Sequence, residues 1–147
     1  MVLMDTRTCT RTRKDDKGVK NFKNEVIMLA TVNHPHLVEF VGYVSKPALL
    51  IVMGYVNGGT LLDYVLEKRK RSIKKFGTEE SSWEMLDVRD TLRILMQVAD
   101  GIGHLHSMRP RMIIHRDIKS ENILITKDRV PKIADLGEAR KIDQQKT

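Results

Sequence analysis

The feature that most constrains this chain is a polar stretch, His115-Arg116-Asp117-Ile118-Lys119-Ser120-Glu121-Asn122, with Asp135-Leu136-Gly137 following thirteen positions after its asparagine. Between them, the apolar run Ile123-Leu124-Ile125 predicts a short buried strand. Lys127-Asp128-Arg129 is a polar turn, and residues 130–134 predict a second strand. A hairpin of this length brings the second polar segment back beside the end of the first.

These two segments resemble the H-R-D-x-x-x-x-N catalytic loop and the metal-binding D-F-G of eukaryotic protein kinases, with Leu136 in place of Phe. The resemblance implies that Asp117 accepts the proton of the attacking hydroxyl, and that Asn122 and Asp135 hold Mg²⁺ on the phosphates of ATP. Lys119 resembles the catalytic-loop lysine of serine/threonine-type kinases, which contacts the γ-phosphate. Taken alone, each segment is an ordinary surface turn, but their order and spacing together favour a site.

Residues 21–32 have the apolar spacing of an amphipathic helix, which Asn33-His34-Pro35 is expected to end. This helix resembles the αC helix of kinases. Glu25 falls where that helix carries the glutamate that pairs with a lysine of kinase strand β3. Without the resemblance, Glu25 is a helix-surface carboxylate. The apolar positions are Phe22, Val26, Leu29 and Ala30.

Residues 34–42 resemble the segment that leads into kinase strand β4, and residues 48–52 predict the next strand. By resemblance, Met53 is the gatekeeper, and Gly54-Tyr55-Val56 is the hinge whose backbone binds adenine. Gly54 departs from the family, where Glu is usual at this position. Leu124 falls where one residue packs below the adenine.

Gly58-Gly59 predicts a turn, and Thr60 is a suitable N-cap for the helix that follows, which resembles kinase helix αD. After that helix we expect a charged stretch, residues 68–75, and an exposed loop over residues 77–82.

Residues 87–106 predict a long helix with one buried face, resembling kinase helix αE. Its apolar positions are Val88, Leu92, Leu95, Met96, Ala99, Ile102 and Leu105. Leu29, Phe40, His115 and Leu136 fall where kinases build the regulatory spine that links the two lobes. Plain core packing is the alternative, and for Leu29, Phe40 and Leu124 the two interpretations hardly differ.

The 147 residues carry a net charge of +7, concentrated in residues 7–23 and 68–75, both expected to face solvent. Nucleic-acid binding is not favoured, because no aromatic residues interleave the 68–75 cluster. A solvated surface or a site for acidic proteins is the preferred interpretation. Cys9 is the single cysteine and no apolar run is long enough to span a membrane, so a cytoplasmic protein is expected.

The sequence contains neither the G-x-G-x-x-G loop nor an A-P-E motif of kinases. Val2-Leu3-Met4 could be the end of kinase strand β3, with its lysine just before Met1. We therefore predict an α+β, partial protein-kinase-like fold. Residues 1–53 form part of the N-lobe, 54–57 the hinge, and 58–147 part of the C-lobe through the start of the activation segment.

Three functions remain open. The first is a segment of an ATP- and Mg-dependent serine/threonine kinase of the tyrosine-kinase-like group, acting on protein substrates but inactive as the isolated chain. The second is a regulatory module that binds a scaffold or a full-length kinase. The third, least favoured, is nucleic-acid binding. By resemblance, Arg116 meets a phosphorylated activation-segment residue, Thr147 or a later one. Partial exposure of the apolar face of the 87–106 helix and of Ile113, Ile114, Ile123 and Ile125 is expected to leave the chain marginally stable.

Overall fold

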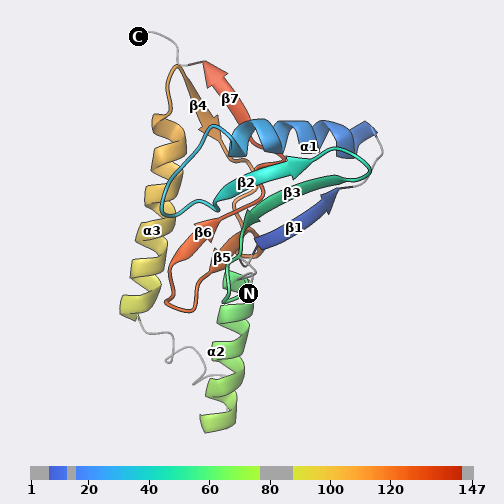
Figure 1. Ribbon diagram of the computed structural model, residues 1–147. Helices are drawn as coiled ribbons and strands as arrows, with labels where there is room; N and C mark the ends of the chain where they lie inside the picture. Colours follow the sequence, from blue (N-terminus) through green and yellow to red (C-terminus); the bar gives the residue numbers. More distant parts are fainter. Residues whose placement is uncertain (1–6, 13–15, 77–87, 144–147) are drawn as a thin grey trace, which may run out of the picture.

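A computed structural model describes residues 7–12, 16–76 and 88–143, and the predicted α+β class is confirmed (Figure 1). The helices are α1 (Asp16–Leu29), α2 (Leu61–Phe76) and α3 (Val88–Ser107), with the short 3-10 helix η2 (Ser120–Asn122). The strands are β1 (Arg7–Thr12), β2 (Phe40–Val44), β3 (Leu49–Gly54), β4 (Arg111–Ile114), β5 (Ile123–Ile125), β6 (Pro131–Ile133) and β7 (Arg140–Asp143).

One antiparallel sheet has the order β1-β3-β2, and α1 runs alongside it. Strand β3 was predicted at 48–52 and is found one residue later at its start and two at its end. Strand β1 was not predicted, because Arg7–Thr12 is polar and lacks the apolar alternation of a strand. Pairing with the central β3 supplies its backbone hydrogen bonds, so tertiary context overrides composition here. The strand proposed at Val2-Leu3-Met4 lies outside the described residues.

Helix α1 begins earlier than predicted, at Asp16, and ends at Leu29 rather than at residue 32. At its C-terminal end, the Thr31 hydroxyl donates to the Met28 carbonyl at 2.8 Å, and the Thr31 amide uses the same acceptor at 3.0 Å. The chain therefore leaves the helix before the proline.

Helix α2 starts with the predicted cap. The Asp63 amide donates to the Thr60 hydroxyl oxygen at 3.0 Å, and the Thr60 amide donates back to the Asp63 carboxylate at 3.0 Å. The helix continues to Phe76, so the charged stretch 68–75 is helical and not a region that follows the helix. Lysine and arginine are good helix formers, which explains the difference. Figure 1 shows the second half projecting from the body, and the loop expected at 77–82 lies outside the described residues.

Helix α3 begins and ends one residue later than predicted. The expected exposure of apolar surface on this helix is found, but the residues predicted to form its buried face are largely wrong. The helix packs through Ile94, Val98, Gly101 and Leu105. Of the predicted positions, Leu105 is buried and Ile102 is partly buried, whereas Ala99 is exposed. Val88, Leu92, Leu95 and Met96 are 69%, 54%, 53% and 71% exposed. The helix carries apolar residues on more than one face, so periodicity alone could not identify the face that packs.

The predicted hairpin forms from β5 and β6, with Ile123 opposite Ile133. It lies between α3 and the sheet, while β4 pairs with β7 at the end of the molecule (Figure 1). The Ile133 amide donates to the His36 carbonyl, and the Val38 amide donates to the Ile133 carbonyl, each at 2.9 Å. The segment between α1 and β2 is thus fixed to β6. Among the described helices, none is long and apolar enough to cross a membrane.

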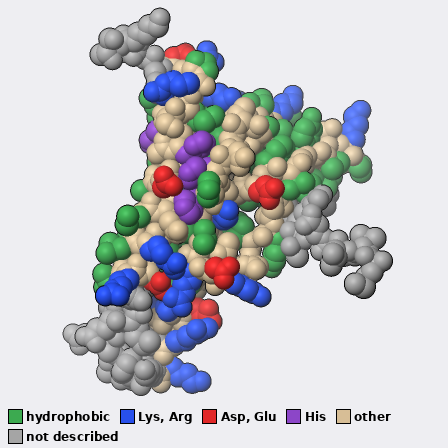
Figure 2. Space-filling view, turned by 60° about the vertical axis from the view of Figure 1, so that its left-hand side comes forward, with side chains coloured by type: hydrophobic (Ala, Val, Ile, Leu, Met, Phe, Trp, Pro, Cys, Tyr) green, Lys and Arg blue, Asp and Glu red, His purple; other side chains and the backbone are tan. Residues whose placement is uncertain are grey.

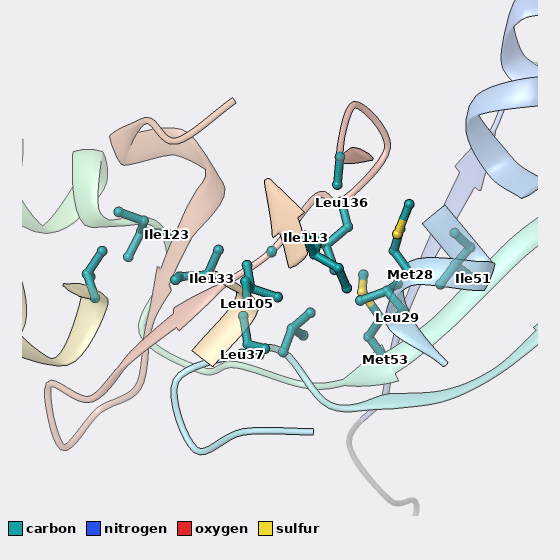
Figure 3. Close-up of a cluster of buried hydrophobic side chains, with 14 of the residues drawn as sticks. Met28, Leu29, Leu37, Ile51, Met53, Leu105, Ile113, Ile123, Ile133 and Leu136 are labelled. Atoms are coloured by element: carbon teal, nitrogen blue, oxygen red, sulfur yellow. The ribbon is translucent and has the colours of Figure 1, made fainter. Parts of the chain in front are cut away.

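The core joins residues from the sheet, α1, α3 and the hairpin. Leu29 and Leu136 are each 1% exposed and share this core with Met28 and Ile113 (Figure 3). The expected partial exposure of Ile113, Ile123 and Ile125 is wrong, because the described core buries all three. On the surface beside it, histidine side chains gather on one face (Figure 2). His34 stacks on His104 at a ring separation of 4.8 Å.

Candidate active site

The loop before β5 gathers the predicted catalytic side chains around one carboxylate. The Lys119 ammonium donates to Asp117 Oδ2 at 2.7 Å, and Asn122 Nδ2 donates to the same oxygen at 2.8 Å. Asn122 Nδ2 also donates to the Asp117 carbonyl at 2.9 Å. The hydrogen bond from Lys119 lowers the pKa of Asp117, and the same contact raises the pKa of Lys119. Asp117 is therefore held as an anion and Lys119 as a cation.

His115 connects this loop to the residue before Asp135. Its ring is buried, and Nε2 lies 3.0 Å from the Ala134 carbonyl oxygen, to which it can only donate. Nδ1 then accepts from the Asp117 amide at 3.3 Å. Burial lowers the pKa of His115, so the neutral tautomer with hydrogen on Nε2 satisfies both contacts. A buried imidazole thus fixes the two segments against each other.

Backbone strain also concentrates here. Arg116 and Asp135 have φ angles of 73° and 61°, values that L-residues adopt at a cost of ~1–3 kcal/mol each and that cluster at functional sites. The Ala134 amide donates to the Asn122 carbonyl at 2.9 Å. Asp135 therefore follows directly on a residue that is bonded to Asn122, as the predicted hairpin requires.

Asn122 and Asp135 are the two residues that the kinase resemblance assigns to Mg²⁺. Asn122 is 9% exposed and uses its amide nitrogen on Asp117, which leaves its side-chain oxygen as the group for a cation. The Asp135 carboxylate is exposed, with Oδ1 accepting from the Gly137 amide at 3.3 Å. Among the described residues, no cluster of three or more His, Cys, Asp or Glu side chains could hold a metal alone. Two oxygen ligands suit Mg²⁺ that is completed by phosphates and water.

Glu25 lies on α1 near Asp135. Burial, and to a lesser extent the charge of Asp135, raises the pKa of Glu25 from 4.5 to about 7. Within the described residues, the structure gives Glu25 no ion pair or hydrogen bond, and strand β1 contains no lysine. The predicted lysine partner is therefore not among the described residues.

The residues predicted to surround adenine lie along the junction between β3 and the hairpin. Met53 is buried at the end of β3, Tyr55 is 53% exposed, and Val56 is partly buried. Leu124, partly buried in the middle of β5, forms a β-bridge with Thr60. The segment after β3 thus runs back to β5.

Sequence reasoning missed Asn24. This side chain donates from Nδ2 to the Gly137 carbonyl and to the Ala139 carbonyl, both at 2.9 Å. The sequence clue that could have pointed to Asn24 is its place next to Glu25 inside a predicted helix, where asparagine is intrinsically unfavourable.

The chain is similar in sequence to a known protein family and to several of its members. Residues 7–147 match the family described as protein tyrosine and serine/threonine kinase. The chain is 42% identical over 120 residues to calmodulin-binding receptor-like cytoplasmic kinase 3 of Arabidopsis thaliana, covering 81% of this chain and 21% of that protein. It is 33% identical over 128 residues to the receptor-like cytosolic serine/threonine-protein kinase RBK1 of the same plant, covering 87% and 24%. Wall-associated receptor kinase-like 20, from the same plant, is 33% identical over 132 residues, covering 89% and 19%. The chain spans about a fifth of these relatives.

Proposed function

The chain belongs to the protein tyrosine and serine/threonine kinase family, and on this premise we propose that its residues carry the catalytic loop of an ATP- and Mg-dependent kinase that phosphorylates serine or threonine hydroxyls of proteins. The α+β fold, with a helix beside a small sheet and a hairpin below it, agrees with part of a kinase domain. The observation that supports the proposal most strongly is the Asp117 carboxylate, which holds both the Lys119 ammonium and the Asn122 amide.

Phosphoryl transfer requires mainly positioning and neutralisation of charge. Asp117, kept ionised, would orient the substrate hydroxyl and accept its proton. Its pKa is lowered, which is acceptable in a loose transition state where a strong base contributes little. Lys119 would balance charge on the transferred phosphoryl group. Asn122 and Asp135 would hold Mg²⁺, which supplies electrostatic stabilisation of the phosphates when bound.

The 147 residues include no glycine-rich phosphate loop and no lysine in β1. We therefore expect these residues alone to transfer phosphate poorly or not at all. Their cytoplasmic location is likewise a proposal. It is supported by two relatives, which are named as a cytoplasmic and a cytosolic kinase.

A regulatory role without catalysis is the second candidate. Glu25 favours it, because a partly buried glutamate near Asp135 without a described cation is not arranged for nucleotide binding. In that case the chain would bind a scaffold or a full-length kinase. Nucleic-acid binding stays the least favoured function, since no feature of the described surface beyond its basic helix supports it.

Regulation by phosphorylation is also proposed. Lys20, Arg116 and Arg140 line one cavity of about 460 Å³ beside α1. Cationic side chains that converge in this way suit a phosphorylated residue of the activation segment. Thr147 lies outside the described residues, so the acceptor stays open.

The test compares this chain with a chimera that adds the flanking kinase segments of calmodulin-binding receptor-like cytoplasmic kinase 3. Transfer of labelled phosphate from ATP to a basic protein is measured with Mg²⁺. We expect activity in the chimera and its loss in the Asp117→Asn form, with phosphate on serine or threonine. An inactive chimera whose parent kinase is active under the same conditions would support the regulatory alternative.

A further inference from the structure

The side chain of Asn24 joins two parts of the molecule that are far apart in sequence. Its Nδ2 donates to the carbonyls of Gly137 and Ala139, 113 and 115 residues later, each at 2.9 Å. Both hydrogens of one amide are therefore used on a single short loop. Asn24 is partly buried, so water competes weakly for these acceptors.

The loop that Asn24 holds is the one that presents Asp135. It is a tight turn, with the Gly137 amide donating to Asp135 Oδ1 at 3.3 Å and the Ala139 amide donating to the Leu136 carbonyl at 3.1 Å. Asp135 has a positive φ of 61°, a conformation that the surrounding contacts must maintain. The two carbonyls bonded to Asn24 belong to residues two and four positions after Asp135.

Other contacts between α1 and the loop do not fix its shape in the same way. Leu136 and Ala139, both 1% exposed, give apolar attraction, which is not directional. Glu25 does not hold Asp135, because the structure gives no hydrogen bond between the two carboxyl groups and the charge of Asp135 raises the pKa of Glu25. Asn21 Nδ2 reaches only the exposed Glu138 carboxylate, at 3.3 Å.

We propose that Asn24 is a positioning residue that couples the placement of α1 to the conformation of residues 135–139. When α1 lies where it does here, one amide holds both carbonyls and the turn presents the Asp135 carboxylate. A shift of α1 of more than a few tenths of an ångström breaks both hydrogen bonds together and releases the turn. The consequence for catalysis rests on the proposed function, whereas the coupling itself does not.

Two substitutions separate hydrogen bonding from packing. Asn24→Leu keeps the approximate size but donates nothing. Asn24→Asp keeps the shape, and its ionised carboxylate faces two carbonyl oxygens that it cannot bond. Protonation returns one O–H donor to Asn24→Asp, so its defect should lessen as the pH is lowered, whereas that of Asn24→Leu should not. Asn21→Leu, one turn earlier on α1, is the matched control.

The first measurement is hydrogen–deuterium exchange of the purified chain, corrected for the intrinsic pH dependence of exchange. We expect both Asn24 variants to exchange at least tenfold faster over residues 136–143. Residues 94–105 of α3 should be unchanged, and Asn21→Leu should resemble the unmodified chain. The proposal is overturned by unchanged exchange in both variants, by an equal effect of Asn21→Leu, or by faster exchange across α3 as well, which would report general loosening. If Asn24→Asp does not fold, the same comparison of exchange is made with Asn24→Leu and Asn24→Ser.

The second measurement uses the active chimera. Asn24→Leu should lower kcat at least tenfold and raise the Mg²⁺ concentration needed for half-maximal rate, with KM for the protein substrate unchanged. A looser turn with normal kinetics would overturn the positioning role. A looser turn in a chimera that is inactive in every form would leave the coupling standing and refute the proposed function alone.

Discussion

The close approach of α3 to β6 can be tested with a matched pair of glycines. At Gly101, an added Cβ would lie 2.9 Å from Ile133 Cδ1 and 3.2 Å from the His36 carbonyl oxygen. At Gly103, in the same helix, an added Cβ would have nothing within 4 Å. Gly101→Ala and Gly103→Ala therefore share the same gain in helix propensity and differ in packing.

The expected magnitudes follow from these two effects. Alanine in a helix is favoured over glycine by ~1 kcal/mol, so Gly103→Ala should stabilise the chain by about that amount. At Gly101 the same gain is opposed by overpacking, which costs ~1–3 kcal/mol in a filled core. Ile133 is only 1% exposed and cannot move aside freely. The difference in unfolding free energy between the two variants should therefore equal the overpacking cost alone.

Thermal and urea unfolding followed by circular dichroism measure this difference. At ~2–4 °C per kcal/mol for a domain of about this size, Gly101→Ala should melt at least ~2 °C below Gly103→Ala. Adding Ile133→Val, which removes Cδ1, should lower stability less in the Gly101→Ala background than in the unmodified chain. Equal stabilisation by both alanines would show that α3 and β6 are not packed as described.

Three further predictions concern titration and exposed surface. Burial first, and then the charge of His104, lowers the pKa of His34 below 6.5. The unfolded chain therefore binds more protons below pH 6.5, and His34 makes stability fall as the pH drops through that value. Glu25 acts in the opposite sense, since its raised pKa makes stability fall as the pH rises from 4.5 to about 7. In magnesium-free buffer, His34→Gln should weaken the fall in unfolding free energy below pH 6.5 without abolishing it, because buried His115 contributes a slope of the same sign. Glu25→Gln should remove the fall in unfolding free energy between pH 4.5 and about 7. Slopes unchanged by these substitutions would contradict the assignments. The double substitution Leu92→Lys and Met96→Glu should let the chain stay monomeric, by light scattering, up to a higher protein concentration. It should cost little stability, because both side chains are more than half exposed.

Local patterns predicted the parts of the site that lie close together in sequence. The β-branched residues of 123–125, with the polar turn after them, predicted the hairpin, and Thr60 predicted the start of α2. The grouping of Asp117, Lys119 and Asn122 was expected from the resemblance to the kinase catalytic loop. These features depend on short-range geometry, which one sequence contains.

The features that were missed depend on distant partners. Strand β1 is polar and forms because β3 offers it hydrogen bonds. The packed face of α3 was misjudged because the choice among its apolar faces is made by the hairpin and the 34–38 segment. Asn24 carries no motif, and its role becomes visible only when residues 137 and 139 are placed beside α1. A single sequence contains no direct record of such pairings.

These distant contacts also determine how the site should respond to double substitution. His115 ties the Asp117 amide to the Ala134 carbonyl, and Asn24 holds the turn that begins one residue later, at Asp135. Both therefore restrain Asp135, from opposite ends of the same short segment. Once either restraint is removed, the segment can already move, and the remaining restraint protects it less. Removing the second restraint should therefore add less to hydrogen exchange than removing it from the unmodified chain. We expect the combined effect of Asn24→Leu and His115→Gln on exchange at residues 136–143 to be smaller than the product of the single effects, whereas independent restraints would multiply.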